Sequence, residues 1–135
     1  MLRFLTAVFL LLHGLVHLLY AGQSRRVFEL QAGMVWPDGS WAFSRAISDG
    51  GTRLLATVLL AVAAAGFVTS GLGVLVRGAW WRPVVVGAAG FSAIIYLLLW
   101  DGRAQDLANQ GAVGLLINAA ILVAALVLDW PDFGF

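Results

Sequence analysis

Two histidines lie four residues apart in the first apolar segment of the chain, His13 and His17. The segment extends from Phe4 to Gly22, which is long enough to cross a bilayer as one helix. Imidazole is costly to place in hydrocarbon, so both rings are expected to face the protein interior or a water-filled cavity. At this spacing they share one helix face, with Cβ atoms roughly 5–6 Å apart. The pair is therefore a candidate binding site.

Further polar residues are expected near the depth of the histidine pair, and they complete the candidate ligand-binding set: Tyr20, Ser92, Tyr96 and Asn118. A helix rises about 1.5 Å per residue, so the position of a residue within its apolar segment predicts its depth. This estimate pairs Ser92 with His13 and Tyr96 with His17, and it puts Asn118 between the two levels. Three helices would then contribute to one polar layer.

Several chemistries are open to such a layer. A quinone or another lipid-like ligand fits well, because it needs apolar walls and a few convergent polar groups. Haem held by two histidines needs them on opposite ring faces, so His13 and His17 on one helix would require a second subunit to supply one ligand. The same pair could bind a metal, although two neutral ligands alone make a weak site. Simple hydrogen bonding between helices, and contact with another subunit, remain open alternatives.

The composition indicates an integral membrane protein. Of 135 residues, 61% are hydrophobic and 11% are charged, whereas soluble domains carry about 25% charged residues. Without cysteine, the chain has no disulfide and no thiolate metal site or thiol redox chemistry of its own. No Asp or Glu falls inside the apolar segments, which disfavours a proton-coupled transporter and a Ser-His-acid hydrolase. A net charge of +1 and the lack of a basic tail give no indication of a nucleic-acid partner.

Four apolar segments, at about 4–22, 54–76, 84–100 and 111–128, predict one transmembrane domain over residues 1–135. We expect an all-α, antiparallel four-helix bundle with a longer polar loop between the first and second helices. The first segment is expected to stay in the mature protein, because Leu19 and Tyr20 stand where a signal-peptide cut needs small residues. An even number of spans puts both termini on one side. Arginine counts do not settle which side, but the tight turn between Arg77 and Arg82 and the acid-rich opposite face favour termini in the cytoplasm.

The connections carry their own expectations. The longest runs from Gln23 to Gly51, with a turn at Pro37 and Asp38, and could form a short hairpin or a loop held at the interface by Trp36 and Trp41. Either arrangement could place a lid over one end of the bundle. Other tryptophans at predicted span ends are expected to be interfacial anchors: Trp80, Trp81, Trp100 and Trp130.

Pairs of alanines four residues apart predict close helix packing. Ala61 and Ala65 in the second span, and Ala89 and Ala93 in the third, have the small-xxx-small spacing that lets helices approach. These faces should pack within the bundle or against another chain.

Several segments, taken in order, resemble a family of small bacterial four-span membrane proteins that has no assigned activity. The segments are His13-Gly14-Leu15-Val16-His17, Gly39-Ser40-Trp41-Ala42-Phe43-Ser44, Trp80-Trp81-Arg82-Pro83, Trp100-Asp101-Gly102 and Gly114-Leu115-Leu116-Ile117-Asn118. The resemblance implies a four-span topology in the bacterial inner membrane and implies no reaction. A looser, fold-level likeness to DoxX-type four-helix proteins rests on size and span count.

Two functions follow as expectations. The first is a non-enzymatic accessory subunit that contacts the lipid bilayer and other membrane subunits or copies of itself. The alternative is a quinone- or haem-associated redox protein that uses the polar layer.

Overall fold

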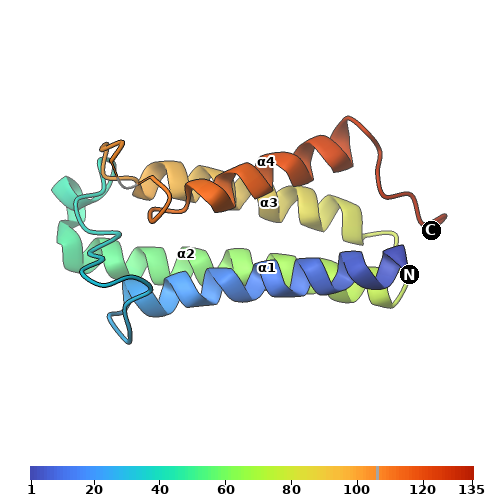
Figure 1. The fold of residues 1–135 in the computed structure, drawn as a ribbon, viewed down its shortest axis with the longest axis horizontal. Coiled ribbons are helices and arrows are strands. Elements are labelled where there is room, and N and C mark those ends of the chain that lie inside the picture. The colour runs from blue at the N-terminus through green and yellow to red at the C-terminus, as the bar shows by residue number, and fades with distance from the viewer. Residues whose placement is uncertain (106) are drawn as a thin grey trace.

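A computed structural model of the chain, describing residues 1–105 and 107–135, contains four α-helices (Figure 1). They are α1 (Leu2–Ser24), α2 (Ser44–Leu75), α3 (Trp81–Leu99) and α4 (Ala112–Leu126). The described residues form no β-strand. Successive helices run in opposite directions, and both termini lie at the same end of the bundle (Figure 1). The predicted all-α antiparallel bundle is confirmed.

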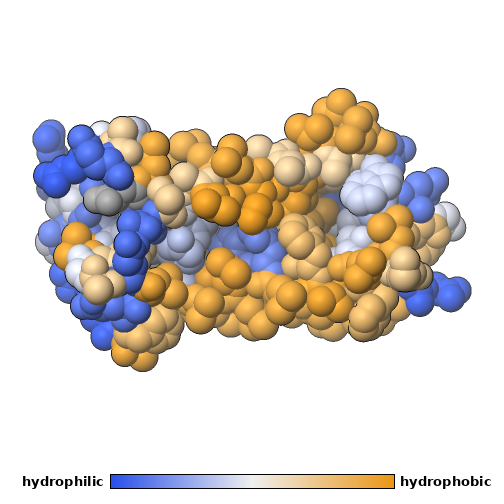
Figure 2. All heavy atoms as spheres, in the orientation of Figure 1, coloured by the Kyte–Doolittle hydropathy of each residue, from blue (hydrophilic) through white to orange (hydrophobic). Residues whose placement is uncertain are grey.

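The surface is that of a membrane protein. Three helices, α1, α2 and α3, are each long and apolar enough to cross a membrane. Figure 2 shows a wide hydrophobic band between two hydrophilic ends. Large apolar side chains point outward within it, as in Leu12 at 57% exposed and Leu116 at 71%. Water-soluble monomers rarely expose a continuous apolar surface of this extent.

The fourth helix is shorter than the predicted span of 111–128. It has 15 residues, which corresponds to about 22 Å at the rise of an α-helix and is less than the roughly 30 Å of a hydrocarbon core. Its last turn closes when the Leu128 and Trp130 amides donate back to the carbonyls of Val123 and Ala124. The chain therefore leaves the helix before Leu128.

The second helix begins earlier than the predicted span, because part of the long connection is helical. Its backbone breaks at Ile47 and Ser48, where Ser48 has φ 62° and ψ 170°. The Ser48 hydroxyl then accepts the Gly51 amide at 3.4 Å, as an N-cap does for a new helix. A short helical segment from Ser44 thus precedes the long span.

Glycines, rather than the predicted alanine pair of α2, allow the closest helix contacts. A Cβ atom on Gly14 of α1 would lie 3.0 Å from Val68 Cγ2 and 3.1 Å from the Ala64 carbonyl oxygen. Ala61 and Ala65 are exposed, so the prediction that they pack within the bundle is wrong. The helix is rotated so that Ala63 and Ala64 face inward instead. On α3, Ala89 is fully buried and Ala93 half-buried.

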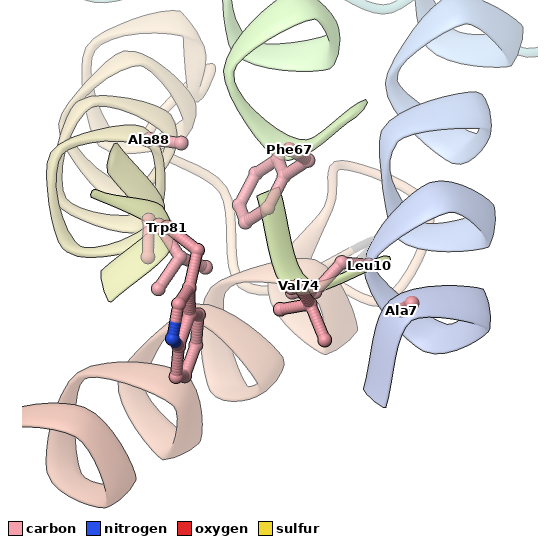
Figure 3. Packing of buried hydrophobic residues seen from close by; sticks show 8 residues of the cluster. Ala7, Leu10, Phe67, Val74, Trp81 and Ala88 are labelled. Atoms are coloured by element: carbon pink, nitrogen blue, oxygen red, sulfur yellow. The ribbon is translucent and has the colours of Figure 1, made fainter. Parts of the chain in front are cut away.

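The apolar core has two clusters, one near each end of the bundle. Figure 3 shows the cluster nearer the termini, where Phe67 and Val74 of α2 lie between α1 and α3. Trp81 belongs to this cluster at 4% exposed, so its predicted role as an interfacial anchor is wrong. The second cluster includes Leu60, Tyr96 and Leu99 and lies toward the long connection.

Residues 25–43 form a folded cap over the end of the bundle rather than a hairpin. Trp36 is 3% exposed and packs against Tyr20 and Tyr96, so it is a core residue and not an anchor. Trp41 stays exposed, and its indole N–H donates to the Leu97 carbonyl at 2.8 Å. The predicted lid is thus present, held on the bundle by direct contacts.

An ion-pair cluster anchors the cap. Both Asp38 carboxylate oxygens accept from Arg53, each at 2.7 Å, and Arg26 lies 2.9 Å from the same carboxylate. Arg26 also donates to the carbonyls of Met34 and Trp36 at 3.2 Å. Arg53 therefore joins the cap to α2, while Arg26, which follows the end of α1, stabilises the cap from within.

Candidate functional site

The histidine pair of α1 faces the bundle interior, as predicted. His13 is 5% exposed and His17 is 1% exposed. Phe67 of α2 packs against both rings, with centroids 4.5 Å from His13 and 5.0 Å from His17. On its other side His13 stacks on Phe9, at 5.9 Å and an interplanar angle of 8°. These aromatic contacts fix the orientation of both imidazoles.

Hydrogen bonds join the histidines to α3 and α4. His13 Nε2 lies 2.9 Å from Asn118 Oδ1, and Asn118 Nδ2 donates to Ser92 Oγ at 2.8 Å. The same hydroxyl lies 2.7 Å from His17 Nε2, while His17 Nδ1 lies 2.8 Å from the His13 carbonyl. We call His13, His17, Ser92 and Asn118 the polar cluster.

The backbone carbonyl of His13 can only accept a hydrogen bond, and this fixes the donor and acceptor of every bond in the polar cluster. The His13 carbonyl has no hydrogen, so His17 Nδ1 donates to it and His17 Nε2, in a neutral ring, accepts. The Ser92 hydroxyl therefore donates to His17, and its oxygen accepts from Asn118. The Asn118 carbonyl oxygen then accepts from His13 Nε2–H. A charged ring would be costly at this depth, which favours this neutral arrangement.

The hydrogen bonds do not follow the predicted matching of depths. Ser92 bonds His17 rather than His13, and Asn118 bonds His13. Depth was estimated from Cα positions, whereas a helical side chain leans toward the N-terminus of its own helix. A long imidazole therefore reaches about a turn away from its backbone, and a serine hydroxyl does not.

The two candidate tyrosines lie beside the polar cluster without bonding to it. The Tyr96 ring is 5.9 Å from the His17 ring and 5.6 Å from the Tyr20 ring. Among the described residues, neither hydroxyl has a hydrogen-bond partner. Among the described residues Tyr96 thus makes no direct hydrogen bond to the histidines, and its ring packs on Trp36 at 5.9 Å in the cap-side core.

Sequence reasoning missed two residues that shape this region, Phe67 and Trp36. Phe67 is one apolar residue among many in its helix, so no local signal marks it as the wall behind both histidines. Trp36 stands beside Pro37 in a polar segment, where an interfacial position was the natural expectation. Its Nε1 is buried without a hydrogen-bond partner in the described structure.

The hydrogen bonds leave few ring nitrogens for a metal or haem iron. Both Nε2 atoms and His17 Nδ1 are engaged. Within the described residues there is also no group of three His, Cys, Asp or Glu side chains able to hold a metal ion. Of the four ring nitrogens, His13 Nδ1 alone lacks a hydrogen-bond partner among the described residues.

A groove separates α1 from α4 above the polar cluster. Helix α1 packs along α2, α2 along α3, and α3 along α4, whereas the described backbones of α1 and α4 do not meet. Figure 2 shows hydrophilic atoms at the bottom of the hollow between these two helices. Of the polar-cluster residues on α1 and α4, His13 keeps the largest exposed fraction, at 5%, against 1% for His17 and 0% for Asn118.

Toward the termini the groove widens into an apolar cavity of about 310 Å³. Side chains of α1 and α4 form its two walls, among them Phe9, Leu10, Ile121 and Ala124, and Trp81 and Trp130 close it. Phe9 thus lines the cavity and also stacks on His13. The cavity and the polar cluster are therefore adjacent.

No protein-family model, curated protein or solved structure matches the chain. The resemblances drawn from the sequence consequently stay predictions, and the geometry alone supports the proposals that follow.

Proposed function

We propose that the protein is a non-enzymatic membrane protein that holds one amphipathic, lipid-like molecule in the groove between α1 and α4. The observation that carries this proposal is an apolar cavity of about 310 Å³ whose lining residue Phe9 stacks on His13 of the polar cluster. Binding sites for small molecules of this kind have volumes of about 300–1,000 Å³, apolar walls and a few polar groups. Such a molecule would place its apolar tail in the cavity and its polar head at His13.

A binding role suits the polar cluster better than a catalytic one. Its hydroxyl already donates to His17, and both histidines have bonded Nε2 atoms. No carboxylate falls in the apolar segments to complete an acid–base pair. A haem would also need a free histidine Nε2. A quinone or another lipid-like molecule therefore fits this site better than a haem does.

Quenching of tryptophan fluorescence tests this proposal. Bromoundecanol, an alkyl alcohol with a terminal bromine, should quench Trp81 saturably in the purified protein, because Trp81 lines the cavity. Ala124→Phe should abolish the saturable part, since the added ring fills the cavity. The matched control, Ala61→Phe, adds the same ring to an exposed position of α2 and should leave quenching unchanged. Equal saturable quenching in both variants, or none in the wild type, would remove the proposal.

An accessory role in a larger membrane complex is a second proposal, favoured by the exposed face of α2. Val58, Val62, Ala61 and Ala65 present a smooth outward strip that no other helix covers in the described residues. Small residues of this kind permit close helix contact. If a partner or second copy covers the strip, Ala65→Leu should reduce the mass of the complex extracted in mild detergent. An unchanged mass would assign this strip to lipid.

A further inference from the structure

We infer that the molecule bound in the groove presents a hydrogen-bond donor, a hydroxyl group, to His13 Nδ1. This inference rests on the proposed function and narrows its ligand to long-chain alcohols, phenols and quinols. It disfavours molecules whose polar head only accepts, such as quinones, ketones, ethers and esters.

The first step is the polarity of His13. Its Nε2 must donate, because Asn118 presents a carbonyl oxygen to it and uses its amide nitrogen to bond Ser92. A neutral imidazole has one N–H, so His13 Nδ1 carries a lone pair and no hydrogen. The tautomer of His13 is fixed by the chain of bonds that starts where His17 Nδ1 donates to the His13 carbonyl, so it is not chosen freely.

The second step is accessibility. His13 Nδ1 has no partner among the described residues, yet it is not among the side-chain atoms that are buried without one. The His13 residue is 95% enclosed, with 5% of its surface exposed. His13 lies on α1 and bonds Asn118 on α4, so its exposed part lies between these two helices. Figure 2 shows hydrophilic atoms at the bottom of the hollow there. An acceptor in a largely apolar site gains most from a ligand that donates.

The third step is rigidity. Phe9 stacks on one face of the His13 ring, and Phe67 meets it edge to face at 4.5 Å and 83°. The Nε2 bond to Asn118 prevents a ring flip that would exchange the two nitrogens. The lone pair is therefore held in place before a ligand arrives, which lowers the entropy lost on binding.

Two measurements test the inference. Heteronuclear NMR of the ring nitrogens should show the histidines as opposite tautomers, with hydrogen on Nε2 of His13 and on Nδ1 of His17. Bromoundecanol should also bind about fivefold more tightly than its methyl ether, the factor for a hydrogen bond of about 1 kcal/mol. The ether keeps the tail and the oxygen and lacks only the donor.

His13→Phe keeps a ring of similar size and removes the lone pair, so it should bind alcohol and ether equally. If this variant does not fold, the wild-type probe pair and the NMR assignment still decide. Equal saturable binding of both probes to the wild type, or a hydrogen on His13 Nδ1, would overturn the inference and leave the proposed function standing. No saturable binding of either probe would overturn both.

Discussion

At the residue scale, one serine hydroxyl holds the polar cluster together. Ser92 Oγ accepts from Asn118 at 2.8 Å and donates to His17 at 2.7 Å, so helices α1, α3 and α4 meet at a single atom. Hydrogen bonds between membrane helices contribute about 0.6 kcal/mol each on average. A buried group that loses its partner costs more, about 1–3 kcal/mol.

Ser92→Ala should therefore destabilise the bundle by about 1–2 kcal/mol, because it leaves His17 Nε2 without a donor. Reversible unfolding in mixed micelles measures the change. Ser70→Ala is the matched control: Ser70 is equally buried, but its hydroxyl donates to the Gly66 carbonyl within α2. Its loss should cost less than about 0.5 kcal/mol. Equal effects of the two substitutions would show that the polar cluster adds no stability.

Hydroxyl groups in these helices bond either to their own helix or to a neighbouring one. The hydroxyls of Thr57 and Ser70 are satisfied within their own helix, since they donate to the carbonyls of Arg53 and Gly66. Ser92 looks no different in the sequence. Its inter-helical role depends on what the neighbouring helices bring to the same depth.

At the scale of elements, the contact between α1 and α2 depends on glycine. Gly14 lies against the Ala64 carbonyl, and Gly71 lies against the Ala7 carbonyl, where a Cβ atom would come within 3.1 Å in each case. Backbone atoms cannot move aside as side chains can. Any larger residue at these positions must separate the helices.

Gly14→Leu should lower the detergent melting temperature, through overpacking that typically costs about 1–3 kcal/mol. Ala65→Leu is the control: it enlarges a side chain at an exposed position of α2 and should leave the melting temperature of the monomer unchanged. Thermal melts of the two variants side by side make the comparison. A larger effect at Ala65 than at Gly14 would contradict the helix rotation described here.

The cap over residues 25–43 is attached to the bundle partly by ion pairs. Asp38 is bound by Arg53 and Arg26, and its side chain is 19% exposed. Partly exposed ion pairs are modest in strength and weaken as salt is added. The cap should therefore open locally far more easily than the bundle unfolds.

Asp38→Asn should accelerate tryptic cleavage at Arg25 and Arg26 by roughly fivefold, which corresponds to about 1 kcal/mol of easier opening. The wild-type rate should also rise with salt concentration. Asp132→Asn, at the other end of the molecule, removes a carboxylate that forms no ion pair among the described residues and should have no effect. Cleavage that is unaffected by both Asp38→Asn and salt would assign the cap's attachment to packing of Trp36 instead.

At the scale of the whole molecule, the topology sets the position of the groove. Each helix packs on its neighbour in sequence, and α1 and α4, the first and last, are left facing each other across the hollow. Only the bond between His13 and Asn118 joins their side chains there among the described residues. A closed four-helix bundle would have filled this space with core side chains.

Reporter fusions at Met1 and Phe135 should land on the same side of the membrane, since both termini lie at one end of the bundle. We propose that this side is the cytoplasm, on the basis of the arginines around the turn between α2 and α3, Arg77 and Arg82. Fusions on opposite sides would contradict the topology. Two periplasmic fusions would contradict the orientation alone.

Hydropathy by itself determined that this chain has four apolar segments in one bundle, because bilayer thickness prescribes their length and charge is excluded from them. The inward orientation of His13 and His17 followed from the same cost. The exposure of Ala61 and Ala65 and the burial of Trp36 were decided by tertiary structure. Helix rotation depends on which glycines meet a neighbouring backbone, and that contact has no local signal.

The bonding of the polar cluster was also decided in three dimensions. Counting residues placed Ser92 and Asn118 at the right depth, because the rise of a helix is constant. It could not pair them with the correct histidine, since side-chain length and direction shift each polar atom by about a helical turn. Nor could it show the groove, which exists because α1 and α4 never pack together over the described residues. The sequence supplies the polar residues of the site, and the arrangement of the helices decides how they bond and where the groove lies.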